Sequence, residues 1–319
     1  MFRKHTRRAA KAAFAISFGV ALLIGLTACG GGGGGGSSNP TTTSSGPKPT
    51  IILGTKNFGE EYILGQLYGQ ALQAKGFKVD YKGSFGSSEL ADKAITSGKM
   101  NFYPEYTGVV ALDLAKAKNA PKSAQGTYST AKQFEETRGL TMLDPTPFAD
   151  TDTFTTLTST ANADGLKTMS DLSKLKSLSY AGFPECQTRI TCILGMKQVY
   201  GLKNITFVPL GSISVYTLLD QHKATGGDGF STDPQQLSKK YTALVDDKHI
   251  FGFQNVAPVL KKSLLTGSNG MLLESTANAV SAKLTLAAMQ AMNKAYVVDK
   301  ATPKQIAHGF LAANGLLTK

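Results

Sequence analysis

The sequence lacks tryptophan altogether, and its 319 residues include only three cysteines and four histidines. Without tryptophan, any aromatic binding site has to be built from the 11 tyrosines and 16 phenylalanines. No two histidines have the spacing of a helical zinc site, and three cysteines are too few for a disulfide-framework fold. We therefore expect no metal site and no small disulfide-rich scaffold.

Motifs of enzymes and nucleotide-binding proteins are also missing. Outside the glycine run at positions 30–36, the sequence has no G-x-S-x-G elbow, no G-x-x-x-x-G-K-[ST] phosphate loop and no G-x-G-x-x-G dinucleotide motif. The adjacent acids Glu60 and Glu61 would face about 100° apart on a helix, which suits a solvated first turn better than a catalytic pair. The sequence predicts a protein that is not an enzyme and that has no catalytic residues and no cofactor.

Positive charge is plentiful, with 34 Lys and Arg against 22 Asp and Glu and a net charge of +12. Such an excess would suit nucleic-acid binding. Five of the basic residues, however, lie in the first eleven positions and precede an apolar run at 12–28, as in a secretory signal. A retained anchor helix is the alternative, because the run is near the lower length limit for a membrane span. Without residues 1–28, 29 basic and 22 acidic residues remain, an excess of +7, and we expect no nucleic-acid partner.

The end of the apolar run, Leu26-Thr27-Ala28-Cys29, resembles the bacterial lipobox, in which a signal peptidase cuts before a cysteine that carries lipid. We predict a lipoprotein signal peptide at 1–28 and lipidation of Cys29. Residues 29–49 are rich in Gly, Ser, Thr and Pro and have almost no apolar side chains to bury, so they predict a flexible tether with a reach of roughly 25 Å. This places the folded body at the extracytoplasmic face of a cell membrane.

The folded body starts near Thr50 with alternating strand-like and helix-like segments. Strand-like stretches at 50–54, 77–81 and 100–103 are separated by helical spacing at 59–75 and 87–95. This order predicts an α/β fold with a parallel sheet. In such sheets, ligands bind beyond the carboxyl ends of the strands.

A second α/β pattern follows, with strand-like segments at 177–182, 205–210 and 229–231. The β-prone stretches 153–158 and 251–260 flank it and predict a double-stranded hinge, with helices from about Ala277 returning to the first lobe. We therefore expect lobe 1 to comprise residues 50–154 and 255–319, and lobe 2 residues 155–254.

The two remaining cysteines, Cys186 and Cys192, enclose five residues and are able to form a disulfide after export. A metal site is the alternative, but the sequence offers no obvious further ligands for it. If Cys29 is lipidated, one of the three cysteines is the membrane anchor and the other two are free to form one disulfide.

Several motifs resemble those of the substrate-binding lipoproteins of ABC importers for glycine betaine, choline and related osmoprotectants. They are TKNFGEEYILGQ at 55–66, GSSELADKAI at 86–95, YPEYTG at 103–108, GFSTD at 229–233 and NVAP at 255–258. The resemblance extends over the body from about residue 50 to 319. It implies a two-lobe type II periplasmic-binding-protein fold that closes on a small ligand and delivers it to a permease and its ATPase.

In the family that the sequence resembles, aromatic rings, usually tyrosines, surround a quaternary ammonium group. A trimethylammonium cation has no N–H to donate, so its recognition relies on aromatic faces worth about 0.5–2 kcal/mol each. Tyr106 matches a cage tyrosine, whereas Phe154, Phe230 and Phe253 stand where the family commonly has Tyr. Phenylalanine in place of tyrosine keeps the aromatic ring at each of these three positions but removes its hydroxyl group. Without the resemblance, these three phenylalanines would be expected in the cores of their strands.

The resemblance also assigns polar groups to the cleft. Glu61 stands where the family often has Gln. A carboxylate that points into the cleft there would favour a cation without its own acid, such as choline, or a basic amino compound, and would oppose a betaine carboxylate. The alternative is that Glu61 only interacts with the helix dipole in the first turn. Arg189 matches a position that contacts a ligand carboxylate or bridges the lobes, or it is a surface arginine. The remaining expected residues are Asn57, Ser87 and Ser88 at helix starts, where capping alone would also explain them, and Asp233 at the hinge-side wall.

The sequence thus predicts a monomeric, lipid-anchored, extracytoplasmic solute receptor of an ABC importer. Its expected ligand is a quaternary ammonium osmoprotectant such as glycine betaine, choline, carnitine or proline betaine. One alternative is a receptor for another small cationic solute or amino acid, including ergothioneine-like betaines. Another is a sensor or binding lipoprotein that serves no transporter.

Overall fold

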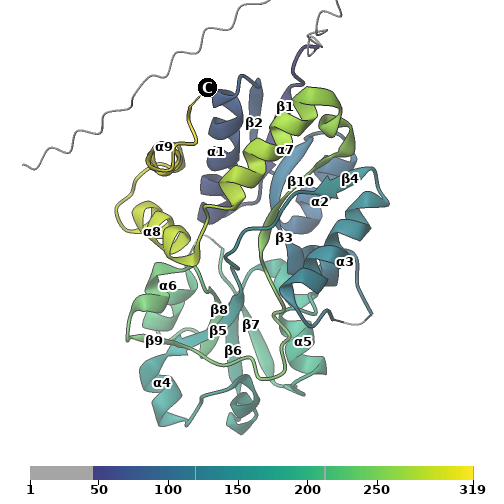
Figure 1. The fold of residues 1–319 in the computed structure, drawn as a ribbon. Helices are drawn as coiled ribbons and strands as arrows, with labels where there is room; N and C mark the ends of the chain where they lie inside the picture. The colour runs from purple at the N-terminus through teal and green to yellow at the C-terminus, as the bar shows by residue number, and fades with distance from the viewer. Residues whose placement is uncertain (1–45, 119, 212, 319) are drawn as a thin grey trace, which may run out of the picture. The chain divides into compact units, whose positions relative to one another are not determined.

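The computed structural model describes residues 46–318 except 119 and 212, and these residues form two five-stranded mixed sheets (Figure 1). The predicted signal peptide, the lipidation site Cys29 and most of the predicted tether lie outside the described residues. Within the described residues, no helix has the length and hydrophobicity needed to cross a membrane.

The first sheet has the strand order β2-β1-β3-β10-β4. Strands β1 and β2 are parallel, as are β1 and β3, whereas β10 runs antiparallel to both β3 and β4. The predicted β-α-β-α-β order is confirmed, because α1 and α2 connect these parallel strands. The elements are β1 (Ile51–Thr55), α1 (Gly59–Ala74), β2 (Val79–Ser84), α2 (Ser88–Thr96), β3 (Phe102–Tyr106), the π-helical η1 (Val109–Leu114), α3 (Ala124–Glu136), β4 (Leu140–Met142) and β10 (Val256–Lys261).

The second sheet has the order β7-β6-β8-β5-β9, in which β6 is parallel to β7 and β8 while β5 is antiparallel to β8 and β9. Its elements are β5 (Asp152–Leu157), α4 (Thr158–Ala163), the 3₁₀ helix η2 (Met169–Lys174), β6 (Leu178–Gly182), the 3₁₀ helix η3 (Pro184–Gln187), α5 (Ile193–Gln198), β7 (Ile205–Pro209), α6 (Val215–Asp220), β8 (Gly226–Phe230), the 3₁₀ helix η4 (Pro234–Leu237) and β9 (Tyr241–Ala243). These two sheets form the two lobes of a type II binding-protein fold.

Central strand β8 has the unusual sequence Gly-Gly-Asp-Gly-Phe, and close packing explains its glycines. A Cβ at Gly226 would lie 2.2 Å from the ring of Phe154, and one at Gly227 would lie 2.5 Å from the carbonyl oxygen of Ala181. Only glycine leaves room for such contacts, so β8 is held tightly between its neighbours.

The chain passes between the two sheets twice, close to residues 149–151 and 252–255. The two crossings lie side by side, because Ala149 pairs with Asn255 and the Asp150 amide donates to the Gln254 carbonyl at 3.0 Å. They are shorter than the sequence predicted, since most of the stretch 153–158 belongs to β5 and half of the stretch 251–260 belongs to β10. The predicted division after residue 154 falls inside β5, which pairs wholly within the second sheet.

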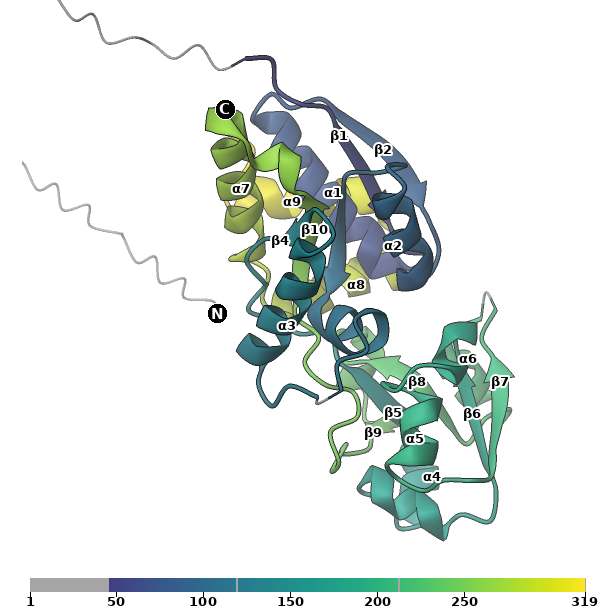
Figure 2. The same cartoon turned by 90° about the vertical axis from the view of Figure 1, so that its right-hand side faces the viewer.

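Three C-terminal helices return to the first sheet and pack against α1, as both ribbon views show (Figures 1 and 2). They are α7 (Gly267–Ser281), α8 (Leu286–Val297) and α9 (Pro303–Ala313), and the 3₁₀ helix η5 (Lys262–Leu265) precedes them. The first of them starts ten residues before the predicted Ala277. Helix α9 begins with a capping box between Thr302 and Gln305 and with proline at its first turn, which satisfies its free backbone N–H groups.

Candidate ligand-binding site

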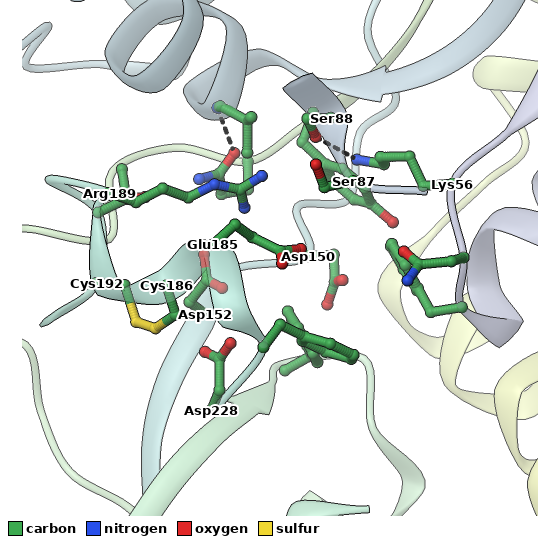
Figure 3. Close-up of a pocket in the computed structure, with 18 residues that line it drawn as sticks. Lys56, Ser87, Ser88, Asp150, Asp152, Glu185, Cys186, Arg189, Cys192 and Asp228 are labelled. Carbon is green, nitrogen blue, oxygen red and sulfur yellow. Dashed lines mark hydrogen bonds between the residues drawn. A yellow bond between two sulfur atoms is a disulfide. The ribbon is translucent and has the colours of Figure 1, made fainter. Parts of the chain in front are cut away.

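A cavity with an empty volume of about 640 Å³, including solvent at its mouth, lies between the two lobes. Residues of both sheets line it at the carboxyl ends of parallel strands, where α/β proteins generally bind ligands. Figure 3 shows four carboxyl groups in this cavity, with Arg189 and the Cys186–Cys192 disulfide toward one side and Lys56 toward the other.

Four aromatic residues line the cavity: Phe58, Tyr106, Phe183 and Phe230. The Phe58 ring lies between two of the others, with its centroid 6.1 Å from that of Tyr106 and 6.2 Å from that of Phe230. The planes of Phe58 and Phe230 differ by only 2°. Because Phe58 comes from the first lobe and Phe230 from the second, this parallel pair joins the two lobes at the cavity.

The cavity also contains four acids, namely Asp150, Asp152, Glu185 and Asp228, and two bases, Lys56 and Arg189. Both bases are already paired with acids that do not line the cavity. Lys56 pairs with Glu105 and lies 3.8 Å from Glu61, and Arg189 donates two hydrogen bonds to Glu89 at 3.0 and 3.1 Å. Among the described residues, none of the four lining acids is part of an ion pair, so neither base neutralises them.

The surroundings oppose ionisation of the three aspartates that line the cavity. Loss of water contact, followed by repulsion from Glu60, raises the pKa of Asp150 well above its usual range. The same loss of water contact and repulsion from Asp152 raise the pKa of Asp228, and the pKa of Asp152 rises to about 6. A bound cation would favour the ionised carboxylates, so the cavity is suited to positive charge.

Comparison with known proteins agrees with this geometry. Residues 49–313 match the model of the OpuAC family, described as the substrate binding domain of ABC-type glycine betaine transport system. The chain belongs to this family. It is 29% identical to the glycine-betaine-binding protein of Pseudomonas aeruginosa, over 84% of this chain and 89% of that protein. It is 25% identical to the glycine betaine-binding protein YehZ of Escherichia coli, over 82% and 90% of the two chains.

Among solved structures, a glycine betaine/carnitine/choline ABC transporter protein matches the fold with a TM-score of 0.67 at 23% identity. The match covers 84% of this chain and 99% of that one. The chain is thus a substrate-binding protein of the OpuAC family, and its family is one of transport proteins rather than enzymes.

The structure brings six of the residues expected from sequence to the cavity of this OpuAC protein: Tyr106, Phe230, Asn57, Ser87, Ser88 and Arg189. Helix-start capping does not explain the two serines, since Ser87 Oγ donates to Glu89 at 2.6 Å and Ser88 Oγ accepts from Lys56 Nζ at 3.3 Å. Arg189 bridges the lobes through Glu89, which is one of the two roles predicted for it.

Two of the expected cage phenylalanines lie elsewhere. Phe154 is fully buried in the core of the second lobe, where its ring packs against Tyr180 with centroids 5.6 Å apart. Phe253 is 37% exposed and does not line the cavity. The assignment of both rings to the cage is therefore corrected.

Two expected polar residues also lie outside the cavity lining. Glu61 is fully buried below it, accepts from the Lys56 amide at 3.1 Å, and has a pKa raised to about 8 by burial despite nearby Lys56. Asp233 lies behind Phe230, where it accepts from the Phe230 amide at 2.9 Å and from the Tyr216 hydroxyl at 2.8 Å. Asp233 thus positions an aromatic ring of the cavity instead of lining it.

Sequence reasoning missed Phe58, Phe183 and all four lining acids. Phe58 is the N-cap residue of α1, in the loop that follows β1, and Phe183 follows the last residue of β6. Both therefore stand at the carboxyl end of a parallel strand, and this position could have identified them. The lining acids belong to no spacing pattern of their own.

The structure contains the disulfide between Cys186 and Cys192, with Cα atoms 5.2 Å apart, in the cavity wall. A carboxylate oxygen of Asp228 lies within 4.8 Å of the sulfurs. Since a disulfide provides no thiolate, these groups do not form a thiolate metal site in this state.

We predict that Phe154→Ala lowers the free energy of unfolding by about 3–5 kcal/mol, because it removes a fully buried ring. Phe253→Ala should change it by less than about 0.5 kcal/mol, because that ring is partly exposed. Urea denaturation followed by circular dichroism measures both values. Equal effects of the two variants would contradict the placement of Phe154 in the core.

Proposed function

We propose that the protein binds a small quaternary ammonium cation in this cavity and delivers it to the permease and ATPase of an ABC importer. The observation that supports this proposal is the combination, in one interlobe cavity, of aromatic rings and carboxyl groups that take part in none of the ion pairs of the described residues. Two curated relatives are named for glycine betaine binding, which points to the same class of ligand.

The aromatic rings suit a cation that cannot donate hydrogen bonds. Phe58, Phe183 and Phe230 offer ring faces without hydroxyl groups, so they attract a methylated ammonium without demanding an N–H donor. The rings of Tyr106 and Phe58 already face a cation, because Lys56 Nζ lies 3.9 Å from the centroid of Tyr106 and 5.5 Å from that of Phe58. The ligand cation is therefore expected nearer Phe183 and Phe230.

Within this class, the charges favour a ligand that has no carboxylate. A betaine carboxylate would meet Asp150, Asp152, Glu185 and Asp228, while both lining bases are engaged by buried or partly buried acids. A hydroxyl group, as in choline, can instead donate to a carboxylate. We therefore propose choline as a better ligand than glycine betaine.

Calorimetric titration of the full-length protein in detergent micelles with choline, glycine betaine and carnitine tests this ranking. We expect choline to bind about tenfold more tightly than glycine betaine, because like charges oppose the latter. Tighter binding of glycine betaine would overturn the preference for a carboxylate-free ligand. Absence of binding to all three compounds would overturn the quaternary ammonium proposal.

A variant pair links the binding to the rings. Phe230→Ala should weaken choline binding about tenfold or more, because one desolvated cation–π contact is worth about 2 kcal/mol. Phe253→Ala is the matched control, since it removes a phenylalanine that lies in a lobe crossing and does not line the cavity.

We predict that choline affinity rises with pH between about 5 and 7. The cation stabilises ionised carboxylates, so binding lowers raised pKa values such as that of Asp152, near 6 in the empty cavity, and releases protons. If binding releases one proton, the dissociation constant for choline falls by about tenfold for each unit of pH increase at pH values well below the Asp152 pKa. Titrations across this range measure the slope, and Asp152→Asn should reduce it. A slope of zero, or of opposite sign, contradicts the role of the acids.

We further propose that the protein is held at the outer face of the cell membrane by lipid on Cys29 after cleavage of residues 1–28. The lipobox-like sequence before Cys29 supports this. In the native bacterial host, Cys29→Ser should abolish metabolic labelling with a radioactive fatty acid and shift the protein from the membrane fraction to the soluble or secreted fraction. Membrane retention of the unlabelled variant would instead support an uncleaved anchor helix.

A further inference from the structure

Three consecutive residues of the loop between Cys186 and Cys192 contact the opposite lobe. Arg189 donates from Nε and an Nη atom to the carboxylate of Glu89 on α2, at 3.0 and 3.1 Å. Thr191 donates from its hydroxyl to Asp113 at the end of η1, at 2.7 Å. Between them, Ile190 packs against an apolar core cluster of the first lobe. We refer to Arg189, Ile190 and Thr191 as the clasp.

The clasp is held firmly on its own lobe. The disulfide closes the loop at both ends, and the Cys192 amide donates to the Arg189 carbonyl at 3.2 Å within it. Helix α5 packs closely against the loop, since a Cβ at Gly195 would lie only 2.0 Å from the Ile190 carbonyl oxygen. The backbone of the clasp is therefore fixed before it meets the first lobe.

The polar contacts of the clasp involve ionised and sheltered groups. Partial burial alone would raise the pKa of Glu89, but the hydrogen bonds and charge of Arg189 bring it down to about 2. Arg189 is only 18% exposed and Thr191 only 3%, whereas the Glu89 side chain is 38% exposed. Charged hydrogen bonds that are shielded from water contribute more than ordinary surface ion pairs.

We propose that the disulfide-closed loop is a clasp that stabilises the lobes in contact, and that the disulfide sets ligand affinity by pre-organising it. This inference goes beyond the ligand assignment, because the clasp residues act between the lobes whichever solute is bound. The apparent dissociation constant equals the intrinsic one divided by the fraction of protein in the binding-competent arrangement. Weakening the clasp lowers this fraction and therefore weakens binding.

Arg189 and Arg138 both donate hydrogen bonds to acids of α2, so variants of the two distinguish loss of the clasp from general destabilisation. Arg189→Gln and Glu89→Gln should each weaken choline binding about tenfold, with non-additive effects in the double variant. The matched control is Arg138→Gln, because Arg138 also makes two hydrogen bonds to α2, through Asp92 at 2.7 and 3.1 Å, but within one lobe. Arg138→Gln should lower the melting temperature and leave the affinity within about twofold of wild type. Equal affinities in all variants would overturn the clasp.

The disulfide is tested by a thiol reductant. Dithiothreitol reduces Cys186–Cys192 to two thiols by supplying two electrons and two protons, and becomes a cyclic disulfide itself. The reduced protein, and the Cys186→Ser/Cys192→Ser variant, should bind choline several-fold more weakly, mainly through faster dissociation. Adding Arg189→Gln to the serine variant should then cost less affinity than it does in wild type. Full affinity after reduction would overturn the pre-organising role.

A ligand-free measurement keeps this test separate from the choline proposal. Hydrogen exchange of residues 186–192 in the full-length protein should be faster in Glu89→Gln than in wild type, because water reaches the loop amides more often when the lobes part. It should be unchanged in Arg138→Gln. If wild type binds none of the quaternary ammonium compounds, the ligand proposal fails, and unchanged exchange in Glu89→Gln would independently reject the clasp.

Discussion

Lys56 extends from the end of β1 under the cavity, where its ammonium group pairs with Glu105, lies 3.8 Å from Glu61 and covers one face of Tyr106. Its side chain is only 4% exposed, and both acids are fully buried. Losing the lysine would leave two carboxyl groups without a counter-charge in the interior, which is costly unless they take up protons. The electrostatics of the cleft depend on this interaction. Because Lys56 interacts with Glu105 and Glu61, it does not neutralise the four acids that line the cavity.

Lys56 affects the electrostatics of the whole cleft because it stands at the carboxyl end of a strand, as do the aromatic residues of the cavity. Lys56 and Phe58 follow β1, Tyr106 ends β3, Phe183 follows β6 and Phe230 ends β8. Each lobe presents the carboxyl ends of its parallel strands to the other, so short stretches far apart in sequence meet around one cavity. Both lobes supply charges and rings at those ends, so neither lobe alone completes the proposed binding site.

The sequence allowed the order of strands and helices to be predicted well, because apolar periodicity reports directly which face is buried. The same periodicity does not report whether a buried ring faces a cavity or the core. Phe154 pairs in the sheet with Asp228, which lines the cavity, yet the Phe154 ring is fully buried against Tyr180. The family correspondence placed Phe154 in the cage, whereas the packing of its ring places it in the core. The lining acids were not found because acidic residues outside a motif look the same in a sequence whether they face a ligand or solvent.

The wall of the cavity and the contact between the lobes are made by the same short loop. Cys186, Arg189, Thr191 and Cys192 line the cavity, and two of them also contact the first lobe. A ligand that touches this wall interacts with groups whose positions depend on lobe contact, so binding and closure are coupled in both directions. The coupling is strongest when the loop is rigid, because a flexible loop could satisfy the ligand without holding the other lobe. A disulfide with only five residues between its cysteines gives this loop little freedom to do so.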